Sequence, residues 1–198
     1  EKYGSDARVL PAGNDVARLQ PMRAGRATLS AMGVGVYFAQ EGLFEFASKE
    51  WGPQPVQITM SSVDCNGLSL AVAADTGVKT VADLKGKRIG FVVGSPALNQ
   101  NALAVLAFAD LSAKDVKIVE FASNNAMWKG TINNDVDAVF GSTISGPAKE
   151  LQTSPRGRRT ISSSLIAAVC RLPAPAPVRS RPHHDGGAAD DHSRPPGS

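Results

Sequence analysis

The 198-residue sequence predicts an α/β fold. Three observations support this prediction. Short stretches such as IGFVV and DVKIVEF are rich in β-branched residues and are bounded by turn residues, which is typical of buried strands. Between them lie longer stretches with apolar residues at helical spacing. Strand and helix then alternate along the chain, and this order indicates βαβ crossovers and a mainly parallel sheet.

In the first half of the chain, extended and helical stretches are expected in turn. A helix is expected over 15–27, and Pro21 should bend or restart it because proline has no amide hydrogen to donate. Large apolar residues predict a helix or helical loop over 37–50 that covers the core. Strands are expected at 7–11, 28–35, 55–63 and 68–74.

The second half follows the same order more clearly. Thr80 is expected to cap a short helix that Gly86 ends, and a buried strand follows over 89–93. Ser95 is a natural N-cap and Pro96 suits the first position of the next helix. A helix over 124–134 is expected between strands at 115–121 and 135–143.

The periodic pattern ends near Ser154. The residues from there to 198 are rich in Pro, Arg, Ser, Ala and Gly. Such a segment buries too little apolar surface to offset an ordering entropy of about 1–2 kcal/mol per residue, so a disordered tail is expected. The abrupt change of composition, placed at about residue 157, also suggests a change of reading frame, which we keep as a hypothesis.

Composition excludes several classes of protein. The net charge of +3 comes from the tail, where seven arginines face three aspartates and no aromatic residue occurs, so a nucleic-acid partner is not expected. No apolar run reaches the ~18 residues that span a bilayer. Cys65 and Cys170 show no metal-ligand or disulfide spacing, and neither a metal nor a cofactor is expected.

The turn after the 89–93 strand is the strongest candidate for a binding site. In α/β folds of this kind ligands lie beyond the carboxyl ends of the strands. A helix that begins at Pro96 would direct the backbone N–H groups of Ala97, Leu98 and Asn99 outward, where they attract an anion. The turn lacks the lysine of a P-loop and the glycine spacing of a dinucleotide site, so a small carboxylate fits better than a phosphate. Ordinary helix capping is the commoner role of such residues, because any turn from a strand into a helix carries a cap.

Small polar residues end other strands and are expected at the same edge of the sheet. Trp128, in the helix before the last of these strands, could stack on a ligand or pack in the core. The predicted ligand-binding residues are Asn14, Gly33, Ser95, Asn99, Asn101, Trp128, Ser142 and Thr143.

An enzyme is not expected. Asp64 and Cys65 suggest a nucleophile, but cysteine or serine catalysis usually needs a nearby histidine. All the histidines (His183, His184 and His192) lie in the tail. A small buried hydrophobic residue is the simpler interpretation of Cys65.

Three stretches carry a resemblance to a known family: ARVLPAGNDVARLQPMRAGRA, SLAVAADTGVKTVADLKGKRIGFVVGSP and AMWKGTINNDVDAVFGST. With them, residues 1–157 resemble a TAXI-type solute receptor, the extracytoplasmic substrate-binding protein of tripartite ATP-independent periplasmic (TRAP) transporters. The resemblance implies a type II periplasmic-binding-protein fold, with two α/β lobes that close on a small carboxylate or amino-acid-like solute. It also implies membrane permease subunits as partners, a periplasmic location, and a signal peptide in the full-length form.

On this resemblance the expected organisation is a partial first lobe over 1–74, a second lobe over 75–153 and the tail over 154–198. The family's first strand, glycine-rich turn and helix would precede these residues, so the first lobe is expected to be incomplete. The turn after Val93 also departs from the Gly-Ser-Gly-Thr pattern of many relatives. An alternative is the effector-sensing domain of a LysR-like transcriptional regulator, which a helix-turn-helix upstream would favour over a signal peptide.

Overall fold

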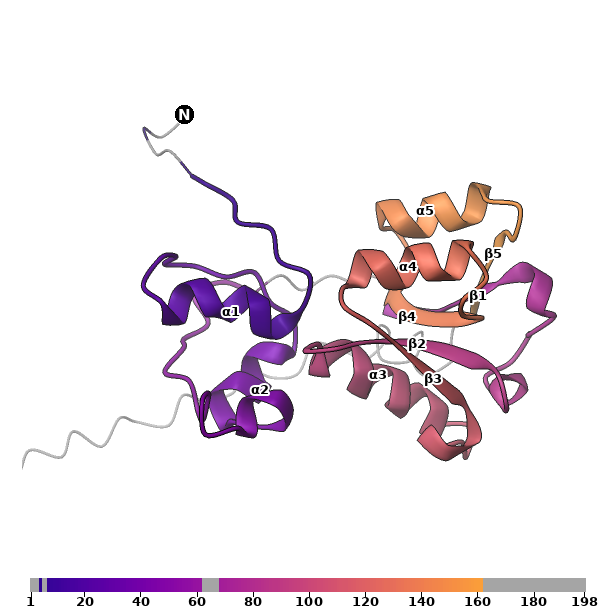
Figure 1. Cartoon of the computed structure of the whole chain (residues 1–198), viewed down its shortest axis with the longest axis horizontal. Helices are drawn as coiled ribbons and strands as arrows, with labels where there is room; N and C mark the ends of the chain where they lie inside the picture. Colours follow the sequence, from indigo (N-terminus) through magenta and orange to yellow (C-terminus); the bar gives the residue numbers. More distant parts are fainter. Residues whose placement is uncertain (1–3, 5–6, 62–67, 162–198) are drawn as a thin grey trace, which may run out of the picture.

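The computed structural model describes residues 4, 7–61 and 68–161. The second part, 68–161, contains a five-stranded sheet with helices on both of its faces (Figure 1). The strands are β1 (Leu68–Ala73), β2 (Arg88–Val92), β3 (Lys117–Phe121), β4 (Ala138–Ser142) and β5 (Arg158–Ile161), and their order in the sheet is β3-β2-β4-β1-β5.

β2, β3, β4 and β5 point the same way, and β1 points the opposite way. β2 is parallel to β3 and to β4, whereas β1 is antiparallel to both of its neighbours, β4 and β5. The predicted α/β class with a mainly parallel sheet is therefore confirmed. The carboxyl ends of β2, β3 and β4 consequently meet at one edge of the sheet, and the end of β1 lies at the opposite edge.

Alternation along each strand sends apolar side chains to both faces, because successive residues of a strand point to opposite sides. Leu70, Val72 and Phe140 lie on the face that α3 (Pro96–Ala107) covers. Ala71 and Val139 lie on the other face, which α4 (Asn124–Ile132) and α5 (Gly146–Thr153) cover. Burial on both faces explains why these strands read as continuous apolar runs in the sequence.

The first part, 7–61, contains α1 (Asp15–Arg23), α2 (Gly35–Glu41) and the short 3-10 helix η1 (Phe44–Ala47). Leu19, Ala39 and Phe46 form a small core between them, separate from the two cores of the sheet. The predicted helix is shorter than expected: α1 continues through Pro21 and ends at Arg23, where the Pro21 carbonyl accepts hydrogen bonds from Arg26 and Ala27. The helical segment expected over 37–50 is present as α2 and η1.

Three predicted strands are wrong. The structure places no strand at 7–11 or 28–35, nor over 55–61, the described portion of the 55–63 prediction. Val9, Leu29 and Met60 on these stretches are largely exposed. A strand is stable only beside a hydrogen-bonded partner, and the sequence pattern of an isolated extended segment does not reveal whether a partner exists.

Elsewhere the differences are small. Thr80 does not cap a helix; Val81 precedes the short 3-10 helix η3 (Ala82–Leu84), and the Asp83 carboxylate accepts hydrogen bonds from the amides of Lys79 and Thr80. The sheet includes β1, before the predicted boundary at 74, and β5, after the predicted boundary at 153. The division into lobes stays a prediction, and Cys65, Cys170, the histidines and residues 162–198 lie outside the described residues. No helix in the described ranges is long and apolar enough to cross a membrane.

Candidate functional site

The turns that follow β2 and β3 form a junction with the segment that precedes α1 (Figure 1). The amide of Val16 donates to the carbonyl of Gly94 at 3.1 Å, and the amide of Asn124 donates to the carbonyl of Gly13 at 3.2 Å. We call residues 13–16, 94–97 and 122–124 the junction. It lies at the carboxyl ends of the parallel strands, where the sequence predicted a binding site.

Two glycines allow the backbones at the junction to approach closely. Gly94 has φ +73°, a conformation that disfavours residues with a Cβ, and a Cβ there would lie 3.1 Å from Nδ2 of Asn14. A Cβ on Gly13 would lie 2.8 Å from Cβ of Ser123. The close contact therefore depends on glycine on both sides of the junction.

Asp15 is the central charged residue of the junction. Its Oδ2 accepts a hydrogen bond from the amide of Ala97 at 3.0 Å, at the N-terminus of α3, and its Oδ1 lies 3.7 Å from Nη1 of Arg18. The residue is 3% exposed. Burial raises the pKa of the Asp15 carboxyl, and the Ala97 hydrogen bond and the Arg18 charge oppose this rise only in part.

This contact corrects one step of the sequence interpretation. The Ala97 amide, which was expected to face an external anion, donates to a carboxylate of the chain itself. The physical expectation that this helix end attracts a carboxylate is met, but by a residue 82 positions earlier in the sequence. An Asp in the first turn of α1 reads in the sequence as a residue that favours its own helix, so no local pattern reveals this partner.

Three of the predicted ligand-binding residues, Asn14, Ser95 and Asn99, lie at or near the junction. Asn14 caps α1, and its Oδ1 accepts from the amide of Ala17 at 2.7 Å. Ser95 precedes α3, is 2% exposed and makes no side-chain cap hydrogen bond. The Asn99 side chain bonds both the amide (3.0 Å) and the carbonyl (2.9 Å) of Val92, so its amide fastens α3 to the end of β2.

The other predicted residues are more dispersed. Asn101 donates to the carbonyl of Ala97 within α3, the Thr143 carbonyl accepts from Arg158, and the Ser142 carbonyl accepts from the Ser145 hydroxyl. Gly33 lies in the loop before α2, and a Cβ there would meet open space.

The expectation that Trp128 could stack on a ligand is corrected. Its side chain is 1% exposed and belongs to the core under α4. A Cβ on Gly141 would lie 2.9 Å from Cζ2 of its ring. The helix that carries Trp128 turns this face to the sheet, so in this conformation the ring is not available to stack on a solute.

An open cleft of about 560 Å³ lies beside α1. It is lined by α1 and by the extended segments 8–12 and 27–32, whose strands were predicted but did not form. Arg8 and Arg18 contribute two positive charges, and no acidic residue lines the cleft. Sequence analysis missed both arginines, because each lies in a segment whose pattern indicated only a strand or a helix.

Asn124 is a further residue that the sequence analysis did not select. Its main-chain amide donates to the carbonyl of Gly13. Its side-chain Oδ1 is buried and has no hydrogen-bond partner within the described part of the chain. Buried polar atoms are nearly always paired, so the junction has a hydrogen-bond acceptor that its own residues do not satisfy.

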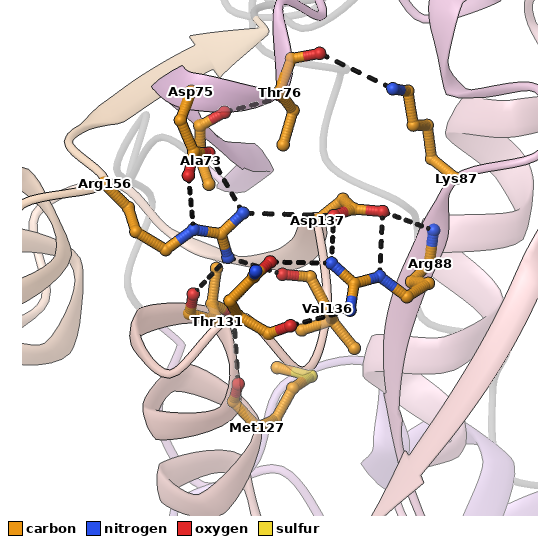
Figure 2. A network of polar contacts seen from close by, with 11 residues as sticks. Ala73, Asp75, Thr76, Lys87, Arg88, Met127, Thr131, Val136, Asp137 and Arg156 are labelled. Carbon is orange, nitrogen blue, oxygen red and sulfur yellow. Dashed lines mark hydrogen bonds and ion pairs between the residues drawn. The ribbon is translucent and has the colours of Figure 1, made fainter.

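A second polar cluster lies at the opposite edge of the sheet (Figure 2). Arg156 donates to both carboxylate oxygens of Asp75, at 2.8 and 3.0 Å, and to the carbonyls of Thr131 and Val136. Arg88 donates to both oxygens of Asp137, at 3.2 and 2.7 Å. Every donor here meets an acceptor of the chain, which indicates a structural cluster that ties β1, β2 and β4 to the segment before β5.

These features define an α/β protein with polar loops gathered at the carboxyl ends of its parallel strands and a cationic cleft beside them. The chain belongs to the NMT1/THI5-like family, whose model matches residues 11–163.

Comparison with solved structures finds partial similarities. The chain is similar to the alkanesulfonate-binding protein SsuA from Xanthomonas axonopodis pv. citri bound to MOPS, at 30% identity and a TM-score of 0.41 over 49% of this chain and 32% of that one. It is also similar to the periplasmic aliphatic sulphonate binding protein SsuA from Escherichia coli, at 25% identity and a TM-score of 0.39 over 50% and 30% of the two chains.

A third similar structure is an ABC transporter / periplasmic binding protein from Brucella ovis with glutathione bound, at 13% identity and a TM-score of 0.40 over 49% and 30% of the two chains. The matched part of the chain thus spans about a third of the length of these proteins. None of the curated proteins compared with the chain matches it.

Proposed function

We propose that this chain is the solute-binding receptor of a transport system, which captures a small organic anion or amino-acid-like solute and presents it to a membrane permease. The observation that supports the proposal best is the open cleft beside α1, because Arg8 and Arg18 line it and no acidic residue does, and guanidinium groups suit an anionic solute. The buried Oδ1 of Asn124, which has no partner within the described residues, adds a hydrogen-bond acceptor at the junction.

The role in this proposal is binding without catalysis, outside the cytoplasm. The chain would hold its solute in the cleft and junction and release it unchanged. Recovery of the solute from the protein and its identification by mass spectrometry test this: an intact solute supports the proposal, whereas a chemically altered product contradicts it. Fractionation of cells that express the whole gene product tests the periplasmic location.

For the membrane partner the proposal has two forms. The resemblance of the sequence to TAXI receptors suggests a TRAP permease. One similar structure carries the name of an ABC transporter protein, and two others are described as sulfonate-binding, which suggests an ABC-type importer instead. A neighbouring gene for an ATPase subunit would favour the ABC form, and a neighbouring fused permease gene would favour the TRAP form.

Isothermal titration calorimetry of the chain tests solute binding directly. The panel should include dicarboxylates, amino acids and alkanesulfonates, together with an uncharged sugar as a control. We expect heat with at least one anionic or zwitterionic member. No heat with any anionic or zwitterionic member would contradict the proposed function.

A further inference from the structure

We draw no further inference here: the strongest candidate, the side chain of Asn124 at the start of α4, whose buried Oδ1 has no hydrogen-bond partner within the described residues, belongs to the junction already described, and nothing in the structure shows what would pair with it.

Discussion

The carboxylate of Asp15 accepts a hydrogen bond from the amide of Ala97, which follows it by 82 residues. This bond joins the start of α1 to the start of α3 and thereby ties the helical segment 7–61 to the sheet of residues 68–161. The contact is favourable because a helix N-terminus carries a partial positive charge, and costly because the carboxylate is buried.

Substitution of Asp15 separates these two effects. Asp15→Ala removes the acceptor and leaves the buried amide of Ala97 unsatisfied, so we expect the free energy of unfolding at pH 7 to fall by about 1–3 kcal/mol. Asp15→Asn keeps an acceptor and removes the buried charge, so we expect no loss. Urea denaturation followed by circular dichroism measures both. A loss for Asp15→Asn as large as that for Asp15→Ala would contradict this explanation.

Asp15 also gives stability a distinctive pH dependence. Its pKa in the folded protein is raised above the ordinary value of 3.8, chiefly by burial, so between these two values the folded state binds more protons than the unfolded state. The contribution of Asp15 to the free energy of unfolding therefore falls as the pH rises through this window. Asp15→Asn should lose this component, and denaturation of both proteins at half-unit steps from pH 3.5 to 7 measures the difference.

The other shifted aspartates act with the opposite sign. For Asp137, burial would raise the pKa, but hydrogen bonds and charge from Arg88 outweigh it and lower the pKa. Backbone and side-chain hydrogen bonds lower the pKa values of Asp83 and Asp115. Their stabilisation is present above pH 3.8 and is lost as the pH falls through the folded pKa. Asp15→Asn should leave this acid limb unchanged, and an altered limb would contradict the assignment.

The cluster at the opposite edge of the sheet predicts a large effect for Arg156. Its side chain is 9% exposed and it donates to Asp75 and to the carbonyls of Thr131 and Val136. Arg156→Met should lower the free energy of unfolding by about 3–5 kcal/mol, because it leaves buried acceptors unpaired. Asp75→Asn is the control: Asp75 is 47% exposed, and its loss should cost at most about 1 kcal/mol. Equal effects of the two substitutions in urea denaturation would contradict the idea of a buried cluster.

Substitution of Gly94 by alanine should lower the free energy of unfolding by more than backbone strain alone explains. Gly94 and Gly77 have nearly equal positive φ values, +73° and +71°, but only a Cβ at Gly94 would meet Asn14. Both alanine variants carry the strain of this conformation, so Gly77→Ala serves as the matched control. We expect Gly94→Ala to lose about 1 kcal/mol more and to weaken binding of any solute that the calorimetric panel identifies. Similar thermal melts and similar binding for the two variants would contradict the proposed role of the junction.

Gly141 tests the position of Trp128. A Cβ on Gly141 would lie 2.9 Å from the indole ring, which is packed in the core, so Gly141→Ala should cost about 1–3 kcal/mol through overpacking. A Cβ on Gly146 meets nothing within 4 Å, and Gly146→Ala should be close to neutral. If Trp128 instead faced a solute, Gly141→Ala would change binding rather than the free energy of unfolding.

Much of the fold of residues 68–161 was predictable from the sequence. The apolar residues of the strand and helix stretches there recur at different spacings, and cap residues mark where helices begin. Ser123, for example, accepts a hydrogen bond from the amide of Ala126 at the start of α4. Position within the sheet was less predictable: β1 has the same apolar pattern as β2, yet it runs antiparallel to its neighbours. Direction depends on the path of the connections and not on the composition of the strand.

The candidate site could be predicted only in its location. The sequence indicated the edge where β2 and β4 end, because a helix start follows the first of these strands and small polar residues follow the second. It could not indicate which side chains would already be bonded or buried within the protein. Asn99 bonds the backbone of Val92, Trp128 packs in the core, and Asp15 accepts a hydrogen bond from the Ala97 amide of α3. Arg8 and Arg18 became candidates only through the shape of the cleft.

The sequence by itself determined the α/β class, the main helices and the polar character of one sheet edge, because these follow from local periodicity, caps and turn residues. The tertiary structure alone decided the pairing of Asp15 with Ala97, the absence of strands over 7–61 and the cationic cleft. Each of these depends on which distant groups meet: a helix end accepts any carboxylate that reaches it, and an extended segment becomes a strand only where a partner lies alongside.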